Sequence, residues 1–487
     1  MELRRFCFGR RIGVFRMGNA SVAYVAAAIA LAIMPYHIYI AGAGVAWIYA
    51  GIFVMLQIAF GWMSFRMMRY ARKNSCVYTV PSFFKARLGL SNFGRTLLAL
   101  IILFPVVVLY ASVLSILGTI LKDFGLGESY IYIILLVTVA FIVSIFIGIR
   151  ASYVTSIPFV TVTIIAIMGI VMVSIIRMGL GEIVRNTIWS DIKGSVSDYI
   201  NIMKKGTRYL YAEEVVNYLS YGFMVFGYLP LLNTFLAAPT AKVIKKSRRL
   251  TALLSVLLFV ASAFLGGISR ALLYPRETEQ SLSGYVRTMF DNLMNGDIVY
   301  KIIAVFYAAA ILMLIVIICC TFLNIITGII VNDLLAQFYI DKIQDADERH
   351  RRENLLIVIA AFIMAGVSAF AACGINVDVT GFSLMIVMMI SAAIGPAAFI
   401  SLFMKKTSKA GFVAGFVTGI AVVLFWEYCP FVNNGSEAVS LSNYTGVNAM
   451  LPGFVLSTIA VIIISLVTWK SDEMLDNMFE EVKNRIV

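Results

Sequence analysis

Two of the long apolar segments in this sequence carry a proline well inside the segment, at corresponding places in the two halves of the chain. The first interruption covers residues 30–35 and ends in Pro35, and the second covers residues 226–230 and ends in Pro230. A helix that crosses lipid must satisfy its backbone polar groups internally, so a break at depth survives only where protein or a watery cavity takes over those groups. Paired breaks therefore predict a transporter with a binding site halfway through the membrane.

The composition indicates an all-α integral membrane protein. Of the 487 residues, 61% are hydrophobic, and the mean hydropathy is +0.92, far above that of a soluble domain. No long polar stretch is present, so we expect one membrane domain in a lipid bilayer. The net charge of +13 does not indicate nucleic-acid binding, because the basic residues lie mostly in short loops between apolar segments.

The apolar segments predict about twelve transmembrane helices. They fall at residues 19–42, 43–68, 96–121, 129–149, 153–176, 215–236, 250–272, 299–336, 354–373, 380–404, 411–429 and 449–469. If the N-terminus is inside, the inside segments hold 28 of the 39 Lys and Arg residues. Positively charged loops face the cytoplasm, so we expect both termini to be cytoplasmic in a multi-pass protein of the plasma membrane.

Several short strings along the chain resemble motifs of the sodium:solute symporter family. The family's "GGRSLG" and "T-x-P-E-F-L-x-x-R-F-G" motifs resemble residues 8–13 and 78–89. Its "AA…KKARR" exit from core helix 6 resembles residues 236–239 and 245–249. The end of core helix 8, core helix 10 and the loop after it resemble residues 332–334, 395–396 and 406–411. The strings keep the family order over nearly the whole chain.

This resemblance implies the LeuT-like fold, which has two inverted repeats of five helices, here followed by two C-terminal helices. We then expect a cytoplasmic N-terminus at 1–18, the first repeat at 19–176, the second at 215–404, peripheral helices at 411–469 and a cytoplasmic tail at 470–487. The family usually has one more helix before its "GGRS" string. This sequence begins at that string, in agreement with twelve spans.

The resemblance also places the family's sodium site, and there the sequence departs from the family. The carbonyls of helix 1 would come from Ala23 and Ala26. The helix-8 positions fall on Leu314, Ile317 and Ile318, where the family has two adjacent hydroxyls. Sodium needs oxygen ligands, which isoleucine does not supply, so we predict weak sodium binding or none. A shift of two or three residues would bring Cys320 and Thr321 into place and supply a single hydroxyl.

The residues near the two breaks are candidates for the substrate site. Helix 6 offers Tyr221, Tyr228 and Asn233, and helix 1 offers Tyr24, Met34 and His37; Asn324 lies in the eighth span. Such a pocket is aromatic and nearly uncharged, so it suits a small neutral or weakly polar organic solute. Each of these residues also has a structural interpretation: tyrosines gather at membrane interfaces, and a buried amide often joins two helices.

His37 is the exception among the spans, because no Asp, Glu, Lys or Arg lies near the middle of any of them. An imidazole at depth can titrate and drive a conformational change. The alternative is a histidine that is hydrogen-bonded and packed at the outer end of helix 1, as buried polar groups usually are.

The sequence favours a secondary-active solute transporter that works by alternating access, with sodium coupling in doubt. The alternatives are a sodium-independent facilitator, a non-transporting receptor with the same fold, and an unrelated twelve-span exporter or flippase. Motifs of enzymes are absent, and two histidines make a zinc or haem site improbable. We expect no catalytic residue, no metal site and no cofactor.

Overall fold

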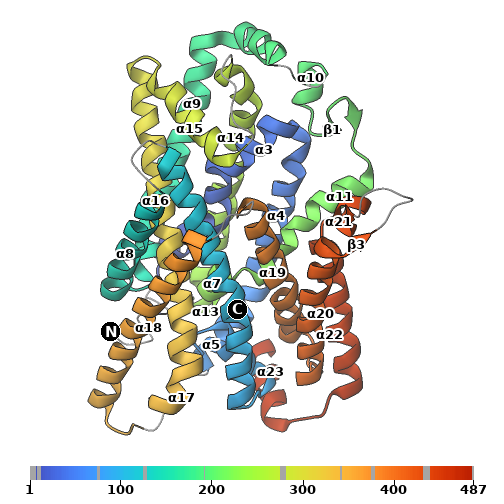
Figure 1. The fold of residues 1–487 in the computed structure, drawn as a ribbon. Helices are drawn as coiled ribbons and strands as arrows, with labels where there is room; N and C mark the ends of the chain where they lie inside the picture. Colours follow the sequence, from blue (N-terminus) through green and yellow to red (C-terminus); the bar gives the residue numbers. More distant parts are fainter. Residues whose placement is uncertain are drawn as a thin grey trace.

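The computed structural model describes residues 7, 12–73, 77–123, 129–190, 192, 194–274, 281–340, 343–374, 379–431 and 439–484. Within them, eleven helices are long and apolar enough to cross a membrane. A bent pair, Ala212–Gly227 with Leu229–Leu236, brings the number to twelve. The predicted all-α membrane fold is confirmed, and Figure 1 shows the spans standing roughly parallel.

The first five spans occupy the N-terminal part of the chain. Helix 1 runs over α2 (Val14–Val22), η1 (Ala23–Ala27), η2 (Ile29–Ile33) and α3 (Met34–Ala41), and helix 2 over η3 (Ala43–Val45), α4 (Ala46–Ile58), η4 (Ala59–Met63) and α5 (Ser64–Lys73). The short α6 (Val80–Leu88) leads to α7 (Asn92–Asp123), α8 (Ser129–Ile147) and α9 (Arg150–Trp189). A loop with α10 (Val196–Tyr199), β1 (Lys204–Lys205) and β2 (Arg208–Tyr209) follows.

The remaining spans begin with helix 6, which consists of α11 (Ala212–Ser220), η5 (Tyr221–Phe223), α12 (Met224–Gly227) and α13 (Leu229–Leu236). After it come α14 (Ala241–Leu273), α15 (Leu282–Met294), α16 (Ile298–Ile329) with η6 (Ile330–Leu335) and α17 (Ala336–Tyr339), α18 (Ala346–Gly374) and α19 (Val379–Phe403). The chain ends in α20 (Lys409–Tyr428), β3 (Pro430–Phe431), β4 (Val439–Ser440), α21 (Leu441–Thr445), α22 (Met450–Thr468) and α23 (Glu473–Asn484).

Helix 6 is interrupted where the sequence predicts it. Tyr228 has extended backbone angles, φ −70° and ψ 105°, and the two halves of the helix meet at a bend of 46°. Pro230 is the cause, because it has no N–H to donate to the carbonyl one turn earlier. The second half of the helix restarts when the N–H groups of Leu231 and Leu232 both donate to the Tyr228 carbonyl.

The predicted break in helix 1 at Pro35 is wrong. The span continues from Val14 to Ala41, and the residues around Pro35 keep helical backbone angles. The helix instead widens into two π-helical segments, η1 and η2, before the proline, and the Met34 N–H donates to the Ile29 carbonyl five residues back. A π-helical register accommodates a proline without unwinding the chain.

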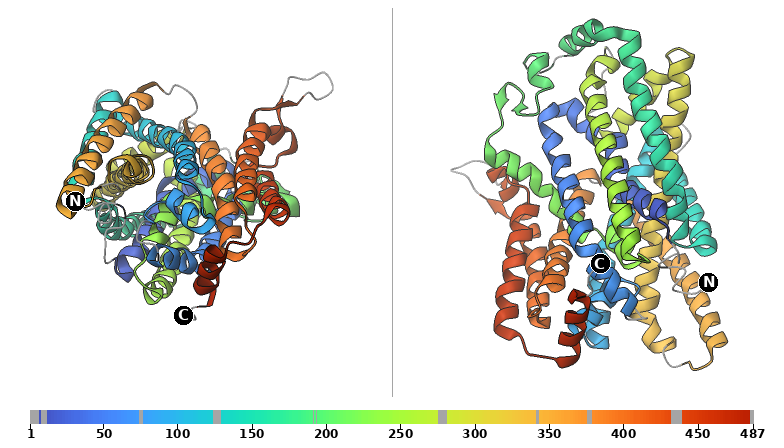
Figure 2. Two further views of the ribbon diagram at one scale, coloured as in Figure 1. Left: turned by 90° about the horizontal axis from the view of Figure 1, so that it is seen from below. Right: turned by 180° about the vertical axis from the view of Figure 1, so that it is seen from behind.

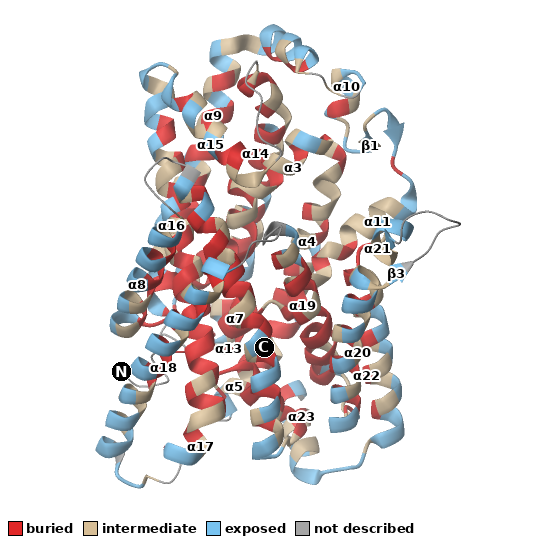
Figure 3. Cartoon of the chain, viewed as in Figure 1, coloured by how far each residue is buried: buried red, intermediate tan, exposed pale blue. Residues whose placement is uncertain are grey.

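The interior of the molecule is formed by helix 1, α7, helix 6 and α19, while α8, α18 and α22 present much exposed apolar surface (Figure 3). Figure 2 shows α20 and α22 standing together at one side of this core. The two peripheral helices pack closely: a Cβ on Gly411 would come within 1.9 Å of the Ser465 hydroxyl oxygen. Small residues allow such close helix contacts in lipid, where the hydrophobic effect between helices is weak.

One end of the molecule carries α5, α17 and α23, and we call it the basic end (Figure 1). Its core holds the buried charged side chains found among the described residues: Arg87, Arg95 and Asp333. Asp333 accepts a hydrogen bond of 2.5 Å from the Thr79 hydroxyl and one from the Asn332 amide. These contacts tie α6 to the end of the eighth span. The string at 78–89 thus has a structural role, whereas residues 8–11 of the first string lie outside the described residues.

Candidate substrate site at the break in helix 6

A small cavity lies directly against the break in helix 6. Gly227, Tyr228, Leu229 and Pro230 form one wall. The other walls come from three spans, α7, α16 and α19, through Val106, Leu109, Phe322, Val387, Ile390 and Ser391. In this conformation the cavity has a volume of about 10 Å³, which is enough for about one water molecule. The lining is apolar except for the hydroxyls of Tyr228 and Ser391 and the free backbone at the break. We call this space the break cavity.

Beside the break cavity, the backbones of helix 6 and α19 are in direct contact. A Cβ on Gly227 would come within 2.4 Å of the Ser391 Cα and 2.8 Å of its carbonyl oxygen. Phe226, one residue earlier, packs edge-on against Phe399 of α19 at a centroid distance of 5.5 Å. The close packing of α12 on α19 therefore depends on the absence of a side chain at Gly227.

Tyr24 of helix 1 is brought close to this region by the π-helical segment η1. Its phenol lies in the neighbourhood of the phenols of Tyr228 and Tyr153. The Tyr24 hydroxyl also lies beside the hydroxyls of Thr321 and Ser152, although its geometry gives no regular hydrogen bond to either. A buried hydroxyl without a partner is rare and points to a water molecule or a ligand nearby.

Thr321 joins the eighth span to the fifth at this level. Its hydroxyl lies 2.9 Å from the Ser152 hydroxyl and donates to the Ile317 carbonyl at 2.6 Å. Ile317 is fully buried, and Leu314 and Ile318 are half-buried; Ala23 and Ala26 are buried on helix 1. The hydroxyl that reaches helix 1 from the eighth span is therefore that of Thr321. Ser152, which the sequence analysis passed over, is its partner.

The remaining candidates lie away from the break cavity. The His37 Nδ1 is 2.6 Å from the Tyr49 hydroxyl, and the Tyr49 hydroxyl also interacts with Tyr221. His37 of helix 1 is thus hydrogen-bonded to a side chain of helix 2, which is the alternative of a packed and hydrogen-bonded histidine. Met34 is buried in helix 1.

The two asparagines are buried and incompletely bonded. Both side-chain polar atoms of Asn324 and the Oδ1 of Asn233 have no partner among the described residues. Neither asparagine lines the break cavity. Of the seven substrate candidates, only Tyr228 lines the break cavity. Tyr24 lies near Tyr228 but does not line the cavity. Ser391 was missed, although it carries the one hydroxyl between Ser383 and Ser401 in the sequence, which was a usable signal.

Comparison with known proteins supports this description. The family model described as the sodium:solute symporter family matches residues 6–419. The chain belongs to the sodium:solute symporter family. It is 22% identical over 471 residues to the osmoregulated proline transporter of Bacillus subtilis (strain 168), covering 94% of this chain and 88% of the relative. It is 26% identical over 460 residues to the high-affinity proline transporter of the same organism, covering 93% and 89%.

Solved structures confirm the fold. A Na⁺-coupled sialic acid symporter superposes with a TM-score of 0.71 at 15% identity, covering 96% of this chain and 93% of that one. Mhp1, a nucleobase-cation-symport-1 family transporter, gives a TM-score of 0.54 at 12% identity, with 97% of each chain covered. The chain therefore has the LeuT-like fold of inverted repeats and is a multi-pass solute transporter, not an enzyme. The unrelated exporter or flippase is excluded by the family match.

Proposed function

We propose that this member of the family carries a small solute with a compact apolar body through the break cavity, and that it does so without sodium. The observation that carries the proposal is the interrupted backbone at Tyr228 facing an apolar space bounded by three other spans. Half-helices that end at the membrane midplane present free backbone groups and helix dipoles to a substrate. The N-terminus of α13 suits a carboxylate, and the apolar walls suit a short hydrocarbon body.

Proline is the first solute to test. It is a zwitterion with a small apolar ring, and the relatives that cover most of this chain are named as proline transporters. No charged side chain lines the break cavity, so a strongly anionic or cationic solute would lose its hydration without a partner. We place the basic end in the cytoplasm of a plasma-membrane protein, in accordance with the excess of Lys and Arg there.

The sodium-free part of the proposal rests on the hydroxyl pair of Thr321 and Ser152. The Thr321 hydroxyl already donates to a carbonyl, and the Tyr24 phenol occupies the space beside the pair. No carboxylate interaction is recorded for these three hydroxyls within the described part of the chain. A hard cation prefers several oxygen ligands, with carboxylates among them. The three hydroxyls of Tyr24, Ser152 and Thr321 offer few oxygens and no carboxylate.

Counterflow of labelled solute tests the proposal. Proteoliposomes are loaded with unlabelled proline in sodium-free buffer and diluted into a trace of labelled proline, beside a panel of small neutral and charged amino acids. A carrier gives transient accumulation of label for at least one small neutral or zwitterionic solute, and Tyr228→Ala reduces the initial rate about tenfold or more, because it removes the side chain at the break. Binding without counterflow would indicate a receptor and contradict the proposal.

A further inference from the structure

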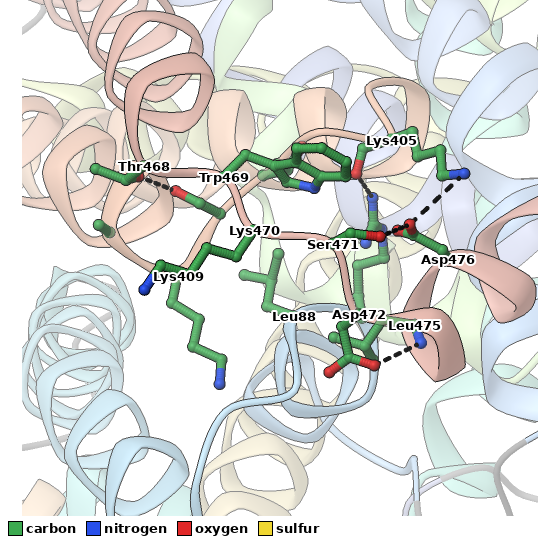
Figure 4. A pocket seen from close by; sticks show the side chains of 14 residues that line it. Leu88, Lys405, Lys409, Thr468, Trp469, Lys470, Ser471, Asp472, Leu475 and Asp476 are labelled. Carbon is green, nitrogen blue, oxygen red and sulfur yellow. Dashed lines mark hydrogen bonds and ion pairs between the residues drawn. The ribbon is translucent and has the colours of Figure 1, made fainter.

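A second cavity lies at the basic end, far along the chain from the break cavity. It has a volume of about 370 Å³ and opens between α6, the loop joining α19 to α20, and the linker joining α22 to α23 (Figure 4). At the density of liquid water, about 30 Å³ per molecule, that volume holds roughly a dozen water molecules. The lining is rich in charged and hydroxyl side chains: Arg87, Lys405, Thr407, Ser408, Lys409, Thr468, Lys470, Ser471, Asp472 and Asp476. We call it the basic-end cavity.

The acidic side chains of this cavity are already occupied. Asp476 lies 3.6 Å from the Lys405 ammonium and accepts a hydrogen bond from the Ser471 hydroxyl at 3.0 Å. Asp472 accepts hydrogen bonds from the N–H groups of Met474 and Leu475 at the start of α23. Both carboxylates therefore hold α23 in place, and Asp476 acts on Lys405 and Arg87. The two carboxylates are outnumbered by the four basic side chains of the lining.

Two ammonium groups of the lining have no such compensation. Lys409 and Lys470 are exposed and form no ion pair with the described residues, and Figure 4 shows both side chains extending from the cavity wall without a partner. The buried Arg87 guanidinium donates to the carbonyls of Ser401 and Met404, and its charge lies within the influence of the Asp476 carboxylate. The cavity has a positive potential that its own residues do not balance.

The position of Lys409 adds to this imbalance. It is the first residue of α20, where the helix dipole is positive and a cation is unfavourable. The bias of basic residues toward the cytoplasm explains cations on this face of the membrane, but it does not explain why they surround a hollow. An anion in the hollow would offset both the dipole and the uncompensated ammonium groups.

The cavity also lies at the level of the membrane border. Trp469 directly follows the last residue of α22 and forms part of the lining, and the Lys406 ammonium sits 5.6 Å from the centre of its ring. Tryptophans favour the level of the lipid headgroups, and basic pockets between spans on the cytoplasmic side bind headgroup phosphates.

We infer that the basic-end cavity binds a phosphate-bearing anion between Lys409 and Lys470, and that the headgroup of an anionic phospholipid of the inner leaflet supplies it. The two ammonium groups serve as point charges for phosphate oxygens, which is the usual role of lysine at such sites. The inference rests on the orientation proposed above and is independent of the transported solute.

The test compares K409Q/K470Q with the wild type and with K245Q/K246Q. Lys245 and Lys246 are exposed at the start of α14 and do not line the cavity, so their replacement is a control with the same loss of charge. Each protein is reconstituted in nanodiscs of equal phosphatidylglycerol and phosphatidylcholine. The phospholipid molecules that each protein retains after detergent extraction are counted by native mass spectrometry. In a second measurement, the melting temperature of each protein is determined with and without glycerol 3-phosphate.

We expect the wild type and the control to retain phosphatidylglycerol, and K409Q/K470Q to retain roughly twenty-five-fold less, since each of the two lysines near the surface contributes roughly fivefold. A second outcome is that glycerol 3-phosphate raises the melting temperature of the wild type but not of K409Q/K470Q, while both proteins retain the same amount of phosphatidylglycerol. This outcome would support the phosphate site but assign it to a soluble anion. If K409Q/K470Q equals the control in both measurements, the inference is wrong. Because neither readout involves transport, this result is separate from the outcome of counterflow.

Discussion

Gly227 is the residue at which helix 6 touches α19 backbone to backbone, and its lack of a side chain allows the two helices to approach this closely beside the break cavity. A Cβ at this position would lie 2.4 Å from the Ser391 Cα, and a backbone atom cannot move aside as a flexible side chain can. The closed conformation therefore depends on the absence of a side chain at one position. The neighbouring Tyr228 then carries the only phenol in the wall of the cavity.

Replacing Gly227 by alanine tests this contact. We expect G227A to lower stability by about 1–3 kcal/mol, as overpacking does, and to slow transport because the closed state is disfavoured. G267A is the control: a Cβ there meets nothing within 4 Å, and alanine favours a helix over glycine. Thermal melting in detergent compares the two. Equal melting temperatures for both variants would show that the contact with Ser391 is not rigid.

At the scale of elements, the two interior prolines behave differently although the sequence treats them alike. Pro230 breaks its helix, whereas Pro35 is accommodated by a π-helical register in a span that is otherwise closely packed. Position within an apolar segment predicts that a proline perturbs a helix, but tertiary packing decides the form of the perturbation. The π-helical segment η1, and not a break at Pro35, sets the position of Tyr24, whose role in binding a substrate stays a prediction.

The loop between α9 and helix 6 is a second element with a testable property. It contacts the outer corner of helices 1 and 2, where the Trp47 indole N–H donates to the Ile202 carbonyl at 2.9 Å. Within it, Asp198 lies 2.5 Å from the Lys204 ammonium, and this hydrogen bond, with those from Ser195, lowers the pKa of Asp198 from 3.8 to about 2. A carboxyl with a depressed pKa stabilises the folded loop above its unfolded pKa.

This loop should therefore loosen in acid. The contribution of Asp198 is complete above about pH 4 and is lost as the pH falls toward 2, because the proton binds the unfolded loop more tightly. Limited proteolysis by pepsin between pH 4 and pH 2 should show increasing cleavage within residues 194–211 in the wild type. D198N should be cleaved already at pH 4, with little further change. A parallel pH response of both proteins would rule out Asp198 as the titrating group.

At the scale of the whole molecule, the number of spans, the interrupted sixth helix and the order of the family strings sufficed to predict the fold. The site was harder to predict, because Ser391, Val106 and Phe322 come from three different spans. Only packing brings them to Tyr228, and no local pattern encodes that packing. The domain boundaries and the ion-site positions stay predictions.

The central claim is a carrier that works without a cation at the hydroxyls of Tyr24, Ser152 and Thr321. Melting of the purified protein in 100 mM sodium chloride against 100 mM choline chloride tests it directly, without knowledge of the substrate. A sodium site with a dissociation constant of about 1 mM would add about 2.7 kcal/mol of stability at this concentration. We predict equal melting temperatures in the two salts. A rise of several degrees specific to sodium, removed by Thr321→Ala, would contradict the account.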